Sequence, residues 1–296
     1  MPSTFFTEPP HWRWLIILYF FLGGIAGGCY FLAALIDLFG RMTDRPLARL
    51  GYRIAFPAVV ICGILLIVDL GRPERFWHML LQSETWRPMF KSYSPMSFGA
   101  WGLMAFGFFA LLSFLATLSP DERRRSRWAS LRPPALLGTS VAILGGLSGF
   151  FLASYTGVLL AVTNRPIWSD TTLLGLVFVV SSASTSIALL LLLGSRRVFL
   201  IGGLRALQRF DVAVLVLELL SLIALVASLG SLARVWLNQW GALLALGVVG
   251  MGIVIPLLLH RRAHAPTALA AKAAAVLVLV GGFLLRVVIV LSSESI

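Results

Sequence analysis

The sequence predicts an all-α polytopic membrane protein with eight transmembrane helices and both termini on the extracytoplasmic side. Three observations lead to this fold class. Hydrophobic residues make up 59% of the 296 residues and charged residues only 12%, about half the charged fraction of a soluble domain. Apolar runs of the roughly 20 residues that cross a bilayer recur along the chain, and basic residues concentrate in alternate connections.

The apolar runs are too long, and alternate too weakly, for the roughly 10-residue strands of an outer-membrane barrel. We therefore assign each run to a helix. No linker, low-complexity segment or repeat separates them, so we expect one membrane domain over residues 1–296. The predicted spans are 14–39, 52–70, 96–118, 135–162, 171–194, 210–232, 236–259 and 268–291.

The basic residues predict how the chain is oriented in the membrane. The formal charge of +12 would favour nucleic acid in a soluble protein. Here the arginines gather in the odd-numbered connections, and cytoplasmic loops are enriched in Lys and Arg. We therefore place these connections in the cytoplasm and expect no nucleic-acid partner. The connection between the first and second spans contains Arg41, Arg45, Arg49 and Arg53. The connection between the third and fourth spans contains Arg123, Arg124, Arg125, Arg127 and Arg132.

The outward connection over 70–95 is long enough to have structure of its own. Pro73 suits a first helical position, and apolar residues spaced by four predict a short helix lying on the membrane surface. Asp69 closes the second spanning helix, where the helix dipole disfavours an acid. It is expected to have a specific partner such as Arg72, in a structural clasp or a proton-accepting role.

Ionisable residues inside the spans are costly and are candidates for function. Glu218 has no basic residue at its level on its own helix and shares a face with Asp211, which suits a proton relay or an interhelical hydrogen bond. Asp37 precedes Arg41 by four residues, so a local ion pair and a functional role are both open. Arg286 is expected to extend toward the outer surface.

No haem or metal is expected in this chain. A b-type haem needs axial ligands inside the bundle, whereas all histidines fall in loops or at membrane boundaries. Cys29 and Cys62 lie inside helices without CxxC spacing, and no zinc or nucleotide motif appears. The four histidines are His11, His78, His260 and His264.

Three segments together resemble the NrfD-like membrane subunits, typified by polysulfide reductase. They are DLGRPERFWHML after the second helix, SPMSFGAW entering the third, and SGFFLASYTGVLLAVTNRPIW in the fourth. The resemblance covers essentially the whole chain and is strongest from Asp69 to Leu193. It implies two four-helix bundles, over 14–162 and 171–291, and a quinone-binding anchor without a complete active site of its own.

The resemblance also implies a quinone site near the outer surface, within the first four helices. A tyrosine of the fourth helix holds the head group in such proteins, and Tyr155 has the matching position. Polysulfide-reductase-type members have a histidine in the first helix, where this sequence has Tyr19. The site would take menaquinone or ubiquinone. The candidate quinone-binding residues are Tyr155, Tyr19, Ser154, Thr156, His11, Asp69 and Arg72.

Two functions follow from these observations. The first is a quinone-binding anchor of a respiratory oxidoreductase in the bacterial inner membrane. It would exchange electrons with an extracytoplasmic iron–sulfur cluster subunit. Complexes of this family often also contain a molybdopterin catalytic subunit. The alternative is a proton-coupled secondary transporter using Glu218 and Asp37 as a proton path, although no broken helix pair occurs at matching positions in two halves. The terminal substrate, the quinone type and the direction of electron flow stay open.

Overall fold

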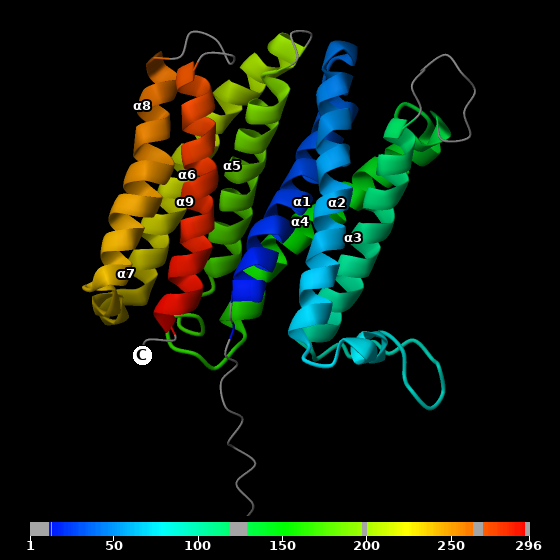
Figure 1. The fold of residues 1–296 in the computed structure, drawn as a ribbon, viewed down its shortest axis with the longest axis horizontal. Coiled ribbons are helices and arrows are strands. Elements are labelled where there is room, and N and C mark those ends of the chain that lie inside the picture. Colours follow the sequence, from blue (N-terminus) through cyan, green and yellow to red (C-terminus); the bar gives the residue numbers. More distant parts are fainter. Residues whose placement is uncertain (1–11, 13, 119–128, 197–199, 263–268, 294–296) are drawn as a thin grey trace, which may run out of the picture.

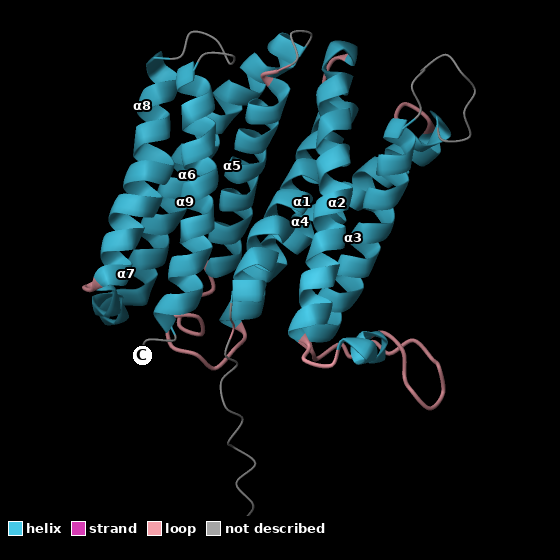
Figure 2. Cartoon of the chain, viewed as in Figure 1, coloured by secondary structure: helices cyan, strands magenta, loops and turns pink. Residues whose placement is uncertain are grey.

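The computed structural model describes residues 12, 14–118, 129–196, 200–262 and 269–293. Eight helical segments of the described residues are long and apolar enough to cross a membrane, as predicted (Figure 1). The described residues contain no strand, apart from one isolated bridge in a loop (Figure 2). The all-α fold class is therefore confirmed.

The eight spans follow one another in the predicted order. The seventh is composite, because a π-helical stretch joins two short α-helices. The elements are α1 (Trp14–Phe39), α2 (Arg45–Asp69), α3 (Pro95–Leu118), α4 (Leu136–Ala161), α5 (Leu174–Gly194), α6 (Ile201–Leu229), α7 (Gln239–Ala242), the π-helix Leu243–Val254, α8 (Ile255–Arg262) and α9 (Leu269–Ser292).

Two helices begin earlier than predicted. Helix α2 starts at Arg45 and α6 at Ile201, whereas the apolar runs begin at 52 and 210. An apolar run reports only the part of a helix that faces lipid, and the backbone hydrogen bonds continue past it. Arginine is itself a good helix former, so the basic residues at these ends extend the helices beyond the membrane.

Helices α1 and α5 lie at the centre of the molecule. Helix α1 contacts α2, α4 and α5, and α5 contacts α4, α6 and α9. The buried share of the apolar window is 72% in α1 and 67% in α5, against 28% in α3. The first four helices and the later ones therefore meet along α1, α4 and α5, while the division into two bundles stays a prediction.

Glycines let the central helices approach closely. A Cβ atom at Gly27 of α1 would overlap the carbonyl oxygen of Gly149 in α4, and one at Gly28 would overlap Ser186 of α5. The two faces of the GGIAGG segment thus contact different helices. Small residues at these positions let the helix backbones pack closely.

The connection between α2 and α3 is an ordered loop. It opens with a short 3-10 helix, Pro73–Met79, whose first residue is the predicted proline. The rings of Trp77 and Trp86 stack with centroids 5.0 Å apart, and Leu81 and Pro88 form an antiparallel bridge. We call residues 70–94 the outer loop. Figure 1 shows it at the same end of the helices as the start of α1 and the end of α9.

Candidate functional site

Tyr155 lies in the interior of the first four helices, and its hydroxyl already has a partner. The hydroxyl donates a hydrogen bond to the carbonyl oxygen of Pro95, the first residue of α3, at 2.6 Å. The side chain is 6% exposed. Gly99 faces the ring so closely that a Cβ atom there would overlap it. No pattern in the sequence indicates this bond, because the two residues are 60 positions apart.

Tyr19 of α1 is near enough to Tyr155 for the two phenols to interact electrostatically. Cys62 of α2 interacts with Tyr19 in the same way. No hydrogen bond of the Tyr19 hydroxyl occurs among the described residues. Tyr19 lies five residues from the start of α1 and Tyr155 six from the end of α4, so both are about 7–9 Å from the same end of the helices.

The hydroxyls on either side of Tyr155 are bonded to their own helix. Ser154 Oγ donates to the carbonyl oxygen of Phe151, and Thr156 Oγ1 to that of Ala153, each at 3.1 Å. Successive residues of an α-helix point about 100° apart, so the three side chains do not converge on one point. A role for Ser154 and Thr156 in binding stays a prediction.

Two other candidate quinone residues are at the periphery. Asp69, the last residue of α2, and Arg72 in the outer loop are both exposed. His11 lies outside the described residues. The structure thus places Tyr19 within electrostatic range of Tyr155, and the roles of all seven candidates in quinone binding stay predictions.

The two phenols and their surroundings fit a quinone head group. A quinone is flat and has two carbonyl acceptors, and it needs donors on an otherwise apolar wall. Among the described residues the Tyr19 hydroxyl has no hydrogen-bond partner, so its donor is available. The Tyr155 ring packs directly on Gly99, and the Tyr19 ring lies against Gly23. The ring of Phe151 stacks on Tyr155 at 5.4 Å between centroids.

A second polar cluster surrounds Arg286 of α9. The expectation that this side chain extends to the surface is wrong, because it is fully buried in protein. Its guanidinium donates to Ser181 Oγ and to the Gly282 carbonyl oxygen at 2.6 Å, and to Ser182 Oγ at 3.1 Å. These bonds satisfy a charge that lipid would not tolerate.

Glu218 belongs to the same cluster. Its carboxyl lies beside the hydroxyls of Ser181 and Ser184 and interacts electrostatically with Arg286. Helix α6 has no basic residue at the level of Glu218, and Arg286 of α9 provides the nearby positive charge. Arg286 also lies over the rings of Phe21 and Phe178, at 5.9 and 5.3 Å, which brings the cluster against α1.

A buried carboxylate–histidine pair joins α6 to α8. Asp211 Oδ2 and His260 Nε2 are 2.8 Å apart, and both side chains are buried. Gln208 contacts the other ring nitrogen of His260 at 3.3 Å. Sequence reasoning placed His260 at the membrane boundary and did not pair it. The shared face of Asp211 and Glu218 on α6 was apparent from the sequence, whereas the pairing of Asp211 with His260 was not.

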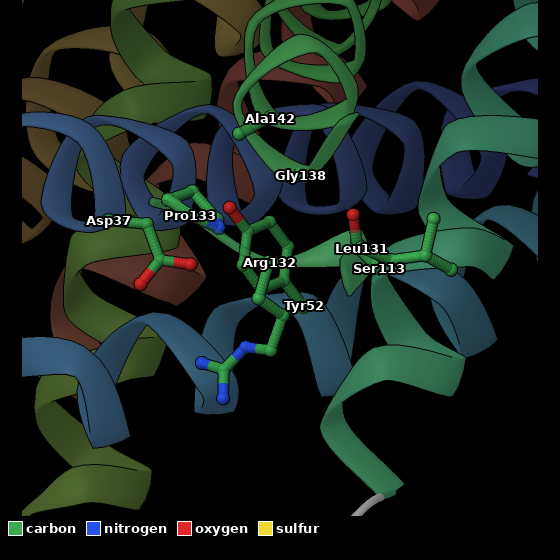
Figure 3. A pocket seen from close by; sticks show the side chains of 8 residues that line it. All are labelled: Asp37, Tyr52, Ser113, Leu131, Arg132, Pro133, Gly138 and Ala142. Carbon is green, nitrogen blue, oxygen red and sulfur yellow. The ribbon is translucent and has the colours of Figure 1, made fainter. Parts of the chain in front are cut away.

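Asp37 lines a small pocket at the opposite end of the first four helices (Figure 3). Its carboxylate interacts electrostatically with Arg132, Arg45 and Arg49, and Tyr52 is a further lining residue. No hydrogen bond or salt bridge to its oxygens occurs among the described residues, so the predicted pair with Arg41 does not form. Asp37 and Glu218 therefore belong to separate polar clusters.

The described part of the chain contains no group of three or more His, Cys, Asp or Glu side chains that could hold a metal ion. Cys29 and Cys62 are both buried and unbridged. The polar side chains that the helices bring together are phenols, hydroxyls, carboxylates, an imidazole and arginines.

Eight spanning helices with polar clusters enclosed between them define the class, a multi-pass helical membrane protein. The family described as "Polysulphide reductase, NrfD" matches residues 2–296. The chain belongs to this NrfD family.

Similar proteins include components of reductases. A polysulfide reductase component of Wolinella succinogenes is 28% identical over 269 residues, covering 84% of this chain and 82% of that protein. Protein NrfD of Escherichia coli is 28% identical over 332 residues, covering 99% and 98%. A selenate reductase component of Mesobacillus selenatarsenatis is 26% identical over 84 residues, 28% of this chain and 20% of that protein. The chain is accordingly a multi-pass protein of the bacterial inner membrane and a membrane subunit of the reductase type.

Proposed function

We propose that this chain binds a quinone or quinol between Tyr19 and Tyr155 and serves as the membrane anchor of a respiratory oxidoreductase. The quinone, menaquinone or ubiquinone, supplies the two-electron chemistry. The chain holds and orients the head group and excludes water from it. Electrons pass between this site and an iron–sulfur cluster subunit on the extracytoplasmic face, in a complex with a molybdopterin catalytic subunit.

The observation that carries this proposal is that two phenols, from α1 and α4, interact electrostatically at the same depth. Both lie about 7–9 Å from the helix ends, which lets a head group reach them while its isoprenoid tail remains in lipid. Tyr19 is the donor that is ready in this structure, because its hydroxyl has no partner among the described residues. A carbonyl oxygen of the head group would accept from it.

The outer loop suits the docking of a partner. Several large side chains on it are exposed, including Trp86 at 66% and Tyr93 at 81%. Exposed aromatic residues and arginines, both present in this loop, are enriched in protein interfaces. A partner seated there would lie next to the end of the helices that holds the two phenols.

Co-purification tests the assignment. The complex, isolated from the native membrane in mild detergent, should contain an iron–sulfur protein and about one extractable quinone per copy of this chain. Tyr19→Phe removes only a hydroxyl and should weaken the binding of a short-chain quinone about threefold to tenfold, the equivalent of one net hydrogen bond. Tyr93→Phe, on the exposed loop, is the matched control. Isolation without any iron–sulfur partner, or quinone binding unaffected by Tyr19→Phe, would argue against this function.

A second candidate function is proton transfer through the later helices. The observation that favours it is the pair of buried clusters, Asp211 with His260 and Glu218 with Arg286, on successive levels of α6. Such a line of titratable groups suits a relay. Asp37 lies outside this line. A transporter path that uses both Glu218 and Asp37 would need further polar groups to link their two clusters.

A further inference from the structure

The hydroxyl of Tyr155 can donate only one hydrogen bond at a time, because a phenol has a single proton. In the structure this proton is directed to the Pro95 carbonyl oxygen at 2.6 Å. Quinone carbonyls are acceptors and cannot share that proton. A quinone that engages Tyr155 must therefore take the hydrogen bond away from Pro95.

The Pro95 carbonyl belongs to the first turn of α3, and this turn holds the end of the outer loop. Ser97 Oγ accepts a hydrogen bond from the Lys91 backbone N–H at 3.1 Å. One turn further along α3, the Trp101 ring N–H donates to the Met89 carbonyl oxygen at 3.0 Å. Residues 89–94 are thus tied to the same two turns of α3 that Tyr155 holds from the other side.

We propose that the bond between Tyr155 and Pro95 is a sensor, through which the outer loop reports whether the quinone site is filled. The inference rests on the proposed function. With the site empty, Tyr155 fixes the first turn of α3 and that turn fixes residues 89–94. With a quinone bound, Tyr155 donates to the ligand, and Pro95 and the loop end lose that support. No proton is transferred, since one acceptor replaces another.

The same link works in reverse. A coupling between two sites is reciprocal for binding, so a partner docked on residues 89–94 changes the affinity of the quinone site. A partner that favours the tied loop competes with the quinone for the Tyr155 proton. A partner that favours the released loop strengthens quinone binding. One hydrogen bond sets the scale, about tenfold at most.

Hydrogen exchange on the intact, purified complex tests the proposal. A short-chain menaquinone and a short-chain ubiquinone are the probes, and calorimetry measures their binding separately. We expect quinone binding to speed amide exchange over residues 89–94, the Lys91 amide included. In Tyr155→Phe the exchange should already be fast and should not respond to quinone.

A second variant keeps the test decisive if Tyr155→Phe does not assemble. Ser97→Ala leaves the bond between Tyr155 and Pro95 intact but removes the acceptor of the Lys91 amide. It should bind quinone normally while exchange at Lys91 no longer responds. Tyr93→Phe, an exposed change in the same loop, should respond like the wild type.

The outcomes separate the two proposals. Quinone binding with unchanged or slower exchange over 89–94 in the wild type overturns the sensor and leaves the quinone-binding function standing. Absence of measurable binding of either quinone overturns the function and the sensor together. A normal exchange response in Tyr155→Phe also overturns the sensor, because the loop would then respond through another route.

Discussion

Several buried polar side chains of this protein donate to backbone carbonyl oxygens of other elements. Tyr155 donates to Pro95, Tyr30 to the Val141 carbonyl at 3.0 Å, and the Trp168 ring N–H to that of Ile289 at 2.8 Å. Within a bilayer no water competes for such donors, and an unsatisfied group costs several kcal/mol. Each bond therefore fixes a helix, or the loop that holds Trp168, against a neighbouring helix.

At the residue scale, Tyr155→Phe and Tyr19→Phe should differ in kind. Tyr155→Phe removes a bond that exists without ligand, so the stability of the complex should fall by about 0.5–1.5 kcal/mol. Its quinone affinity should change by less than about threefold. In the wild type Tyr155 gives up its hydrogen bond to Pro95 when it donates to the quinone, so binding gains no additional hydrogen bond there. Tyr19→Phe should weaken the quinone affinity about threefold to tenfold and leave the stability of the complex unchanged. Melting curves beside quinone titrations check this, and a large affinity loss in Tyr155→Phe at unchanged stability would contradict it.

The buried cluster around Arg286 gives a second residue-scale prediction. Arg286→Met should destabilise the complex by about 3–5 kcal/mol, since it leaves the Glu218 carboxyl and two serine hydroxyls without their cation. Glu218→Gln should cost much less, because an amide can still bond to Ser181. Thermal melting of the two variants is the measurement, and a wild-type melting temperature in Arg286→Met would exclude this account of the cluster.

If Glu218 relays protons, Glu218→Gln should also slow proton uptake coupled to turnover while quinone affinity stays the same. The neutral amide cannot give or take a proton in this role. Proton uptake by the complex in vesicles is the readout. Normal coupling in this variant would return Glu218 to a purely structural role.

At the scale of the elements, the contact between α1 and α4 depends on Gly27. An added Cβ atom would overlap the Gly149 carbonyl oxygen, and both helices must move apart to admit it. Gly27→Ala should therefore cost about 1–3 kcal/mol, as overpacking does. Gly107→Ala in α3 is a matched control, because a Cβ atom there meets nothing within 4 Å. It should be neutral or stabilise by up to about 1 kcal/mol; equal melting of the two variants would contradict the packing argument.

At the scale of the whole molecule, the arginine asymmetry predicts which end of the helices faces outward. Ser83 on the outer loop and Met42 before α2 are both exposed. The native Cys29 and Cys62 are buried and will not interfere. Ser83→Cys should react with an impermeant thiol reagent on intact cells, and Met42→Cys should react only after lysis. The opposite result would invert the topology and move the proposed partner to the cytoplasm.

The sequence by itself determined the number and order of the spans and predicts their orientation. Length, apolarity and loop charge are local properties, and a bilayer responds to them one segment at a time. The resemblance pointed to Tyr155 and Tyr19 as a pair.

Only the tertiary structure decided what each buried polar group contacts. The Tyr155 hydroxyl reaches a carbonyl 60 residues away, Arg286 reaches a serine 105 residues away, and Asp211 meets a histidine 49 residues along the chain. Such pairs depend on which helices are neighbours and on how each is rotated about its axis. In a sequence where almost every face of a helix is apolar, no periodic pattern records that rotation, so the partners emerge only when the helices pack.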